Sequence, residues 1–140
     1  MTTLKAALIV SLIAAAACRP HSNPQVEPKP ATVGWRPVET FSGRGSTQTQ
    51  SFDIGVGQWR IKWEAQNESP PGTGTLEVTV HSAVSGRPLE LVVNHRGTGH
   101  GIAYVNEDPR LFHLVIDSNN VDWTVAIEEA VVGAAETGKP

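Results

Sequence analysis

The residues with the clearest chemical potential are two histidines, His95 and His100, in the glycine-rich run Asn94–Gly101. Imidazole nitrogens bind zinc, and a zinc site needs three or four nitrogen or sulfur ligands, which His81 or His113 would complete from a neighbouring strand. The spacing matches no strong metal motif, however, and the run is also typical of a glycine-rich hairpin that carries surface histidines. We therefore expect neither a metal nor another cofactor, and keep His95 and His100 as weak candidates.

An acid- and amide-rich run, Asp117–Asp122, separates two strand-like segments. Its oxygens are of the kind that calcium prefers, but the run lacks the glycine and the distal glutamate of a helix–loop–helix calcium site. Aspartate and asparagine also form turns by bonding their own backbone. We therefore expect a plain hairpin here.

Residues for catalysis are sparse. Ser46, Ser51 and Ser82 lack a Gly-x-Ser-x-Gly elbow, and nothing in the sequence joins one of them to a histidine in a triad. Glu64 and Glu77 would form a carboxylate pair of the glycosidase type only if neighbouring strands brought them together. Outward acids are usually solvated surface, so we predict that this chain is not an enzyme.

The single cysteine, Cys18, directly follows a segment with the shape of a secretory leader. Lys5 supplies a positive charge, and Ala6–Ala17 is an apolar run broken only by Ser11 and too short to span a bilayer. An exported protein with one unpaired thiol is unusual. No second cysteine exists, so the fold must be stable without a disulfide.

Small residues followed by a cysteine resemble the lipobox of bacterial lipoproteins, although Ala15 stands where that family usually has leucine. The resemblance implies that residues 1–17 are a signal peptide, that the Cys18 thiol receives a diacylglycerol and that the new amino terminus is acylated. Acyl chains contribute ~0.8 kcal/mol per buried methylene, enough for lasting attachment. Arg19 in place of an aspartate implies the outer membrane, facing the periplasm or the surface. The alternative is an ordinary signal peptide cut after Ala17.

Composition changes again after the leader. Residues 18–35 contain four prolines and few large apolar residues, which predicts a lipid-anchored, extended spacer. Residues 36–132 have the length of one domain, and residues 133–140 are expected to form a flexible tail. Trp35 at the end of the spacer either packs against the domain or offers an exposed stacking face, and we favour packing.

Within the domain, apolar and polar residues alternate with the period of a β-strand. In the clearest case, Trp59, Ile61 and Trp63 share one face of a strand. Turn residues separate the segments, and no amphipathic helical segment is visible between them. About seven or eight short strands of this kind predict an all-β fold, an antiparallel β-sandwich or jelly roll. The strand-like segments are 48–54, 58–64, 74–80, 88–95, 102–105, 112–117 and 121–128.

The segments Gln58–Glu64 and Val121–Glu128 resemble strands of small secreted bacterial β-sandwich modules. Most residues of this pattern are core positions, so the resemblance implies a fold and leaves ligand and activity open. The net charge of −3, one unit more negative once Lys5 is removed, argues against nucleic-acid binding. We expect a lipid-anchored envelope protein that binds or scaffolds an envelope protein or a glycan. The alternative is a metal- or small-ligand-binding envelope protein that uses His95 and His100.

Overall fold

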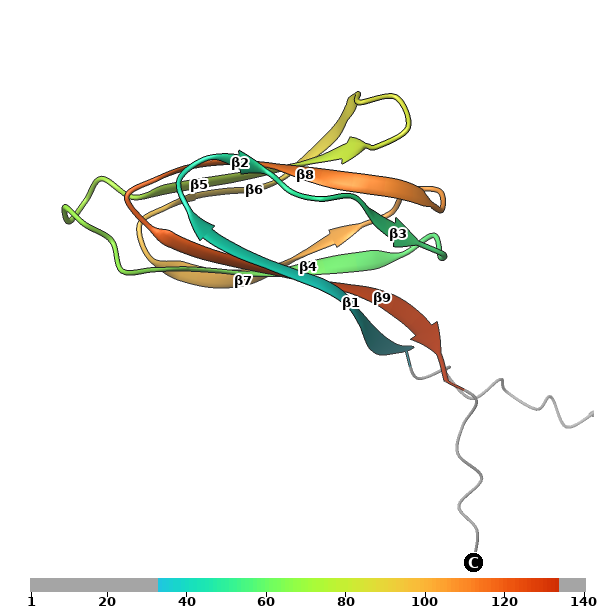
Figure 1. Ribbon diagram of the computed structural model, residues 1–140. Coiled ribbons are helices and arrows are strands. Elements are labelled where there is room, and N and C mark those ends of the chain that lie inside the picture. Colours follow the sequence, from blue (N-terminus) through green and yellow to red (C-terminus); the bar gives the residue numbers. More distant parts are fainter. Residues whose placement is uncertain (1–32, 134–140) are drawn as a thin grey trace, which may run out of the picture. The chain divides into compact units, whose positions relative to one another are not determined.

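Two antiparallel sheets face each other in the structure, a computed structural model that describes residues 33–133 (Figure 1). In spatial order, sheet A contains β1 (Val33–Arg44), β9 (Asp122–Val132), β4 (Trp59–Gln66) and β7 (Gly99–Val105). Sheet B contains β2 (Thr47–Gln48), β8 (Arg110–Asn119), β5 (Thr75–Ser82) and β6 (Pro88–Arg96), and the short β3 (Phe52–Ile54) also pairs with β8. The predicted all-β sandwich is confirmed, with nine strands in the described range rather than seven or eight.

The strand pairs are nested along the chain: β1 pairs with β9, β2 and β3 with β8, β4 with β7, and β5 with β6. This nesting is the jelly-roll arrangement, in which a long antiparallel ribbon folds over itself. Among the described strands, only β5 and β6 are consecutive strands that pair with each other. Strands β2 and β3 both pair with β8, and all other connections between consecutive strands change sheets. The predicted hairpins at 94–101 and 117–122 are therefore wrong: both are corners that lead from sheet B to sheet A.

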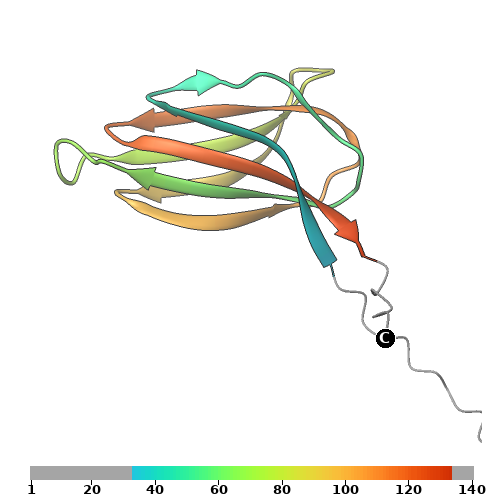
Figure 2. The ribbon, with the colours of Figure 1, turned by 60° about the horizontal axis from the view of Figure 1, so that its bottom comes forward.

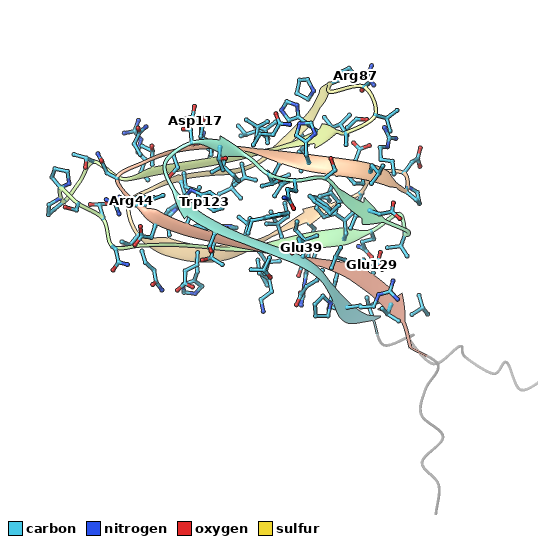
Figure 3. All side chains as sticks on the ribbon, in the orientation of Figure 1. Glu39, Arg44, Arg87, Asp117, Trp123 and Glu129 are labelled. Atoms are coloured by element: carbon cyan, nitrogen blue, oxygen red, sulfur yellow. The ribbon has the colours of Figure 1, made fainter. Side chains whose placement is uncertain are left out.

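Buried side chains from both sheets fill the space between them. Trp59 is fully buried, and its ring centroid lies 5.0 Å from that of Phe112 and 5.6 Å from that of Phe52. Trp123 is also buried, and Figure 3 shows its side chain between the two sheets. Trp63 occupies the same face of β4 as Trp59 but is only half-buried against this core. The other buried apolar residues are Ile54, Ile61, Ala65, Leu76, Val78, Val80, Val93, Val105, Leu114, Ile116, Val121, Val125 and Ile127.

Strand β1 corrects the predicted boundary between spacer and domain. The strand begins at Val33, so the last residues of the predicted spacer 18–35, Trp35 among them, belong to the sandwich. Its twelve residues include no fully buried position, because β1 is an edge strand of sheet A. A bulge between Pro37 and Glu39 also breaks the period-two pattern, and proline is tolerated in sheets mainly at such edge positions. The alternation that reveals a strand is therefore missing from this segment.

The outer ends of β1 and β9 continue together as a two-stranded ribbon beyond the other strands (Figure 2). Glu129 fastens this ribbon to the sandwich. Its carboxylate is buried, forms an ion pair with Arg36 and accepts a hydrogen bond of 3.1 Å from the backbone N–H of Gly55. A buried carboxylate with two such donors is compensated for its lost hydration.

The predicted domain end is close to the observed one, because β9 ends at Val132. The predicted signal peptide 1–17, the lipidation site Cys18, spacer residues 18–32 and tail residues 134–140 lie outside the described residues. No helix in the described part of the chain is long and apolar enough to cross a membrane.

Trp59 and Trp123 should differ in their response to the same substitution. The indole N–H of Trp123 donates to the Gly45 carbonyl at 2.9 Å, whereas the buried Trp59 Nε1 has no hydrogen-bond partner. Trp59→Ala should cost ~3–5 kcal/mol of unfolding free energy. Trp123→Phe should cost ~1 kcal/mol more than Trp59→Phe, because it leaves a carbonyl unpaired. Urea denaturation measures both, and equal costs for the two phenylalanine variants would contradict the assigned hydrogen-bonding difference.

Candidate functional site

The structure separates the two histidines that were candidates for a metal site. His95 pairs across the ladder with the buried Leu76, on the inner side of β6. Its ring packs against Trp63 with centroids 4.8 Å apart, and its Nε2 lies 3.1 Å from the Thr98 carbonyl oxygen. His100 pairs with Glu64 at an outward position of sheet A. Residues 33–133 contain no cluster of three or more side chains suited to a metal, and His95 and His100 do not form the shared site that their spacing suggested.

The glycines around these histidines have a packing role. A Cβ at Gly101 would lie 2.9 Å from the Trp63 indole, and a Cβ at Gly99 would lie 2.6 Å from His95 Nε2. Gly97 has a φ of 80°, in the left-handed region that favours glycine. The glycine-rich run therefore allows the corner between β6 and β7 to close over two aromatic rings.

The remaining histidine candidates form a pair on the outer side of sheet B. His81 and His113 are opposite each other on β5 and β8, and their rings stack with centroids 5.1 Å apart. His81 Nδ1 lies 3.1 Å from the Gly86 carbonyl oxygen. Burial lowers the pKa of His113 below its ordinary value of 6.5, and the neighbouring His81 lowers it further. This pair is remote in the ladder from His95, which pairs with Leu76.

The two acids of the 117–122 run are also held apart. Asp117 lies on sheet B, where it accepts a hydrogen bond of 3.0 Å from Ser46, and Figure 3 shows its side chain pointing away from the sandwich. Asp122 lies on sheet A, and hydrogen bonds from Asn67 and then from Arg44 lower its pKa. The two carboxylates lie on different sheets, and each already has a hydrogen-bond partner in the protein. The turn therefore offers no joint calcium site.

The candidate catalytic residues are likewise dispersed. Glu64 and Glu77 are outward residues of sheet A and sheet B respectively, so they lie on opposite faces of the sandwich. The Ser46 hydroxyl bonds Asp117, and the buried Ser82 accepts a hydrogen bond of 3.4 Å from Ser85 in its own hairpin. Ser51 is exposed between β2 and β3.

The outer face of sheet A carries the most distinctive surface of the described residues. Trp35 on β1 and Tyr104 on β7 meet across the intervening strands, with ring centroids 5.9 Å apart and an interplanar angle of 55°. The Arg60 guanidinium lies 4.1 Å from the centroid of the Trp35 ring and forms an ion pair of 2.5 Å with Glu128. Tyr104 remains 52% exposed. We call Trp35, Arg60, Glu128 and Tyr104 the aromatic platform.

A shallow groove of about 540 Å³ adjoins the platform on the same face. Arg60 and Tyr104 are one alternation step along their strands from Lys62 and Ile102, which border the groove. Thr124 and Ala126 keep its floor low, because their outward side chains are small. The volume lies within the ~300–1,000 Å³ range of small-molecule sites. The groove is lined by Lys62, Trp63, Glu64, His100, Gly101, Ile102, Thr124 and Ala126.

The platform and the groove together offer apolar faces beside groups that donate and accept hydrogen bonds. Ile102 is 47% exposed on the same strand as Tyr104, and the groove also borders the inward-facing residues Trp63 and Gly101. Lys62 donates hydrogen bonds, and Glu64 accepts one from Gln66. In the described range no salt bridge occupies Lys62 or His100. This chemistry fits reversible binding of a ligand with both apolar and polar edges.

The sequence did not predict that Tyr104, Arg60 and Trp35 lie together on one surface. The available signal was alternation, since Tyr104 occupies an outward position in the predicted strand 102–105. Its neighbours come from strands far away in the chain, and only the nested pairing brings β1, β4 and β7 into one sheet.

Gly101→Ala should destabilise the domain by ~1–3 kcal/mol, because the added methyl group would overlap the Trp63 indole. Gly57→Ala is the matched control, because a Cβ at Gly57 would meet nothing within 4 Å. Chemical denaturation gives the cost, and tryptophan emission shows whether Trp63 has moved. A Gly101→Ala domain as stable as the control would contradict the packing role of Gly101.

Stability should fall as the pH drops below 6.5, because the folded domain holds His113 with a lowered pKa. As the pH falls, the unfolded chain takes up the proton first. The stability that neutral His113 contributes is therefore complete above pH 6.5 and decreases until the pH passes the lowered pKa of His113 in the folded domain. His113→Gln should weaken this pH dependence, whereas His100→Gln on the exposed face should keep it. Denaturation midpoints between neutral and mildly acidic pH test this, and an unchanged slope in His113→Gln would contradict it.

Neither the protein-family models nor the curated proteins that were searched match this chain. Its function is therefore inferred from the aromatic platform, the groove and the sequence of residues 1–18.

Proposed function

We propose that this chain is a lipid-anchored protein of the cell envelope that acts as a non-catalytic binding module. Acylated Cys18 holds it to the membrane, most simply the outer membrane by the lipobox resemblance. The proline-rich residues 19–32 act as a spacer with a reach of roughly 40 Å when extended. The sandwich then presents the outer face of sheet A to a partner on the periplasmic or surface side.

The observation that carries the binding role is the exposure of Tyr104, the outermost ring of the aromatic platform, beside a groove. Exposed aromatic residues that lie next to unpaired polar groups on a rigid sheet are typical of binding surfaces, because they offer contact area at low entropic cost. The opposite outer face also exposes apolar residues, Leu91 and Leu111 among them, but sheet B contains no tyrosine or tryptophan in its described strands. The dispersal of the candidate acids, serines and histidines supports a binding role over hydrolysis.

The anchor is tested by mass spectrometry of the exported chain. We expect a product that begins at Cys18, carries the mass of the acyl groups and sediments with membranes. Cys18→Ser should release the protein from the membrane fraction, because a hydroxyl does not form the required thioether. A free Cys18 thiol on the wild-type exported protein would overturn this part of the proposal.

The binding face is tested by photo-crosslinking in intact envelopes. A photoreactive phenylalanine derivative replaces Tyr104, which keeps an aromatic ring at that position, and the control replaces Leu91 on sheet B. Both residues are 52% exposed, so accessibility to solvent is matched. We expect specific products from position 104 only. Equal products from both positions, or none from position 104, would contradict the assignment of sheet A as the binding face.

A further inference from the structure

We infer that the aromatic platform and the groove bind a neutral glycan chain of β-linked hexopyranoses. This inference rests on the proposed function, because it names the ligand of the same face of sheet A. It follows from three features of that face: an exposed Tyr104 ring held by the half-buried Trp35, a low polar groove and balanced charge.

The rings supply a surface for the apolar side of a sugar. A β-linked hexopyranose with equatorial hydroxyls carries C–H groups on both ring faces, and these pack against aromatic rings. Tyr104 exposes half of its surface, and its contact with Trp35 limits the movement of both side chains. Arg60 covers Trp35 and is itself held by Glu128. The rings are therefore fixed before a ligand arrives, which reduces the entropic cost of binding.

The groove supplies hydrogen bonds for the edge of the next sugar. Sugar hydroxyls both donate and accept, and the groove offers both kinds of partner: the Lys62 ammonium donates, the Glu64 carboxylate accepts, and the Thr124 hydroxyl does either. These groups stand around a floor kept low by the small side chain of Ala126. Because the groove is one alternation step from the platform, or ~7 Å along a strand, adjacent sugars of one chain reach both.

The charge on this face favours a neutral glycan over other ligands. The Arg60 charge is balanced by Glu128. Lys62 and Glu64, which carry opposite charges, are two residues apart on the outer face of β4. A polyphosphate or an acidic polymer needs an excess of cations, which this face lacks. The centre of a protein interface is usually depleted in charged residues, whereas Lys62 and Glu64 border the groove itself. An open face also suits an extended chain better than a compact ligand.

The test uses the exported full chain in detergent micelles and two soluble probes, the β-1,4-linked tetrasaccharides of glucose and of N-acetylglucosamine. Binding is followed by tryptophan fluorescence, since Trp35 and Trp63 border the proposed site, and by amide chemical shifts. We expect at least one probe to shift amides of Arg60–Glu64 and His100–Tyr104. Tyr104→Ala should weaken that affinity about tenfold, the effect of losing about 1.4 kcal/mol of stacking.

Two variants separate a local effect from a folding defect. Tyr104→Phe keeps the ring and should keep the affinity, whereas Leu91→Ala removes an equally exposed side chain from sheet B and should leave affinity and shifts unchanged. Failure of both tetrasaccharides to bind would overturn the glycan inference, as would binding that Tyr104→Ala leaves intact.

The outcome also distinguishes this inference from the proposed function. Specific photo-crosslinking from position 104 without tetrasaccharide binding would leave the binding face standing and eliminate the glycan. Crosslinking to a protein at that position would assign the face to a protein partner instead. Absence of both crosslinking and sugar binding would eliminate the function and the ligand together.

Discussion

The contact among Trp59, Phe52 and Phe112 is the interaction on which the sandwich depends. Trp59 comes from sheet A and the two phenylalanines from sheet B, and their ring centroids lie 5.0 to 6.2 Å apart. The described domain contains no cysteine, so its sheets are held by packing and by the chain corners. An aromatic side chain buries ~150–250 Å², and these three lie in one cluster at the layer interface. Most of the apolar burial therefore lies between the sheets, and the outer faces contribute less to stability.

The two outer faces differ in shape because their side chains differ in size. On sheet A, the outward residues of β9 include Ala126 and Ala130, while β4 and β7 carry the longer side chains of Arg60 and Tyr104. Low residues beside tall ones create a groove without any loop. On sheet B, the outer face carries the stacked pair of His81 and the buried His113 near the end of β5. The shape of the candidate site thus follows from residue size along ordinary strands.

The sequence allowed the layers of the fold to be predicted, but not the neighbours within each layer. Alternation around Trp59 and Trp123 identifies inward rows because burial on one face imposes a period of two. The edge strand β1 was missed, because an exposed strand with a bulge at Pro37 has no such row. His95 and His100 were grouped because they are close in the chain, yet a corner between sheets turns them to different sides. The platform was missed for the converse reason: Trp35 and Tyr104 are distant in sequence and meet only through nested pairing.

The candidate site and the core are connected through the corner between β6 and β7. Trp63 is an inward residue of β4, and its indole packs directly against the inner side of Gly101, whose backbone borders the groove on the outer face. His95 supports the same indole from sheet B. The groove wall is consequently positioned by residues of both sheets, and its shape is set when the sandwich closes. A rigid groove of this kind suits selective binding without conformational change, because the ordering of its wall is completed during folding rather than on contact with a ligand.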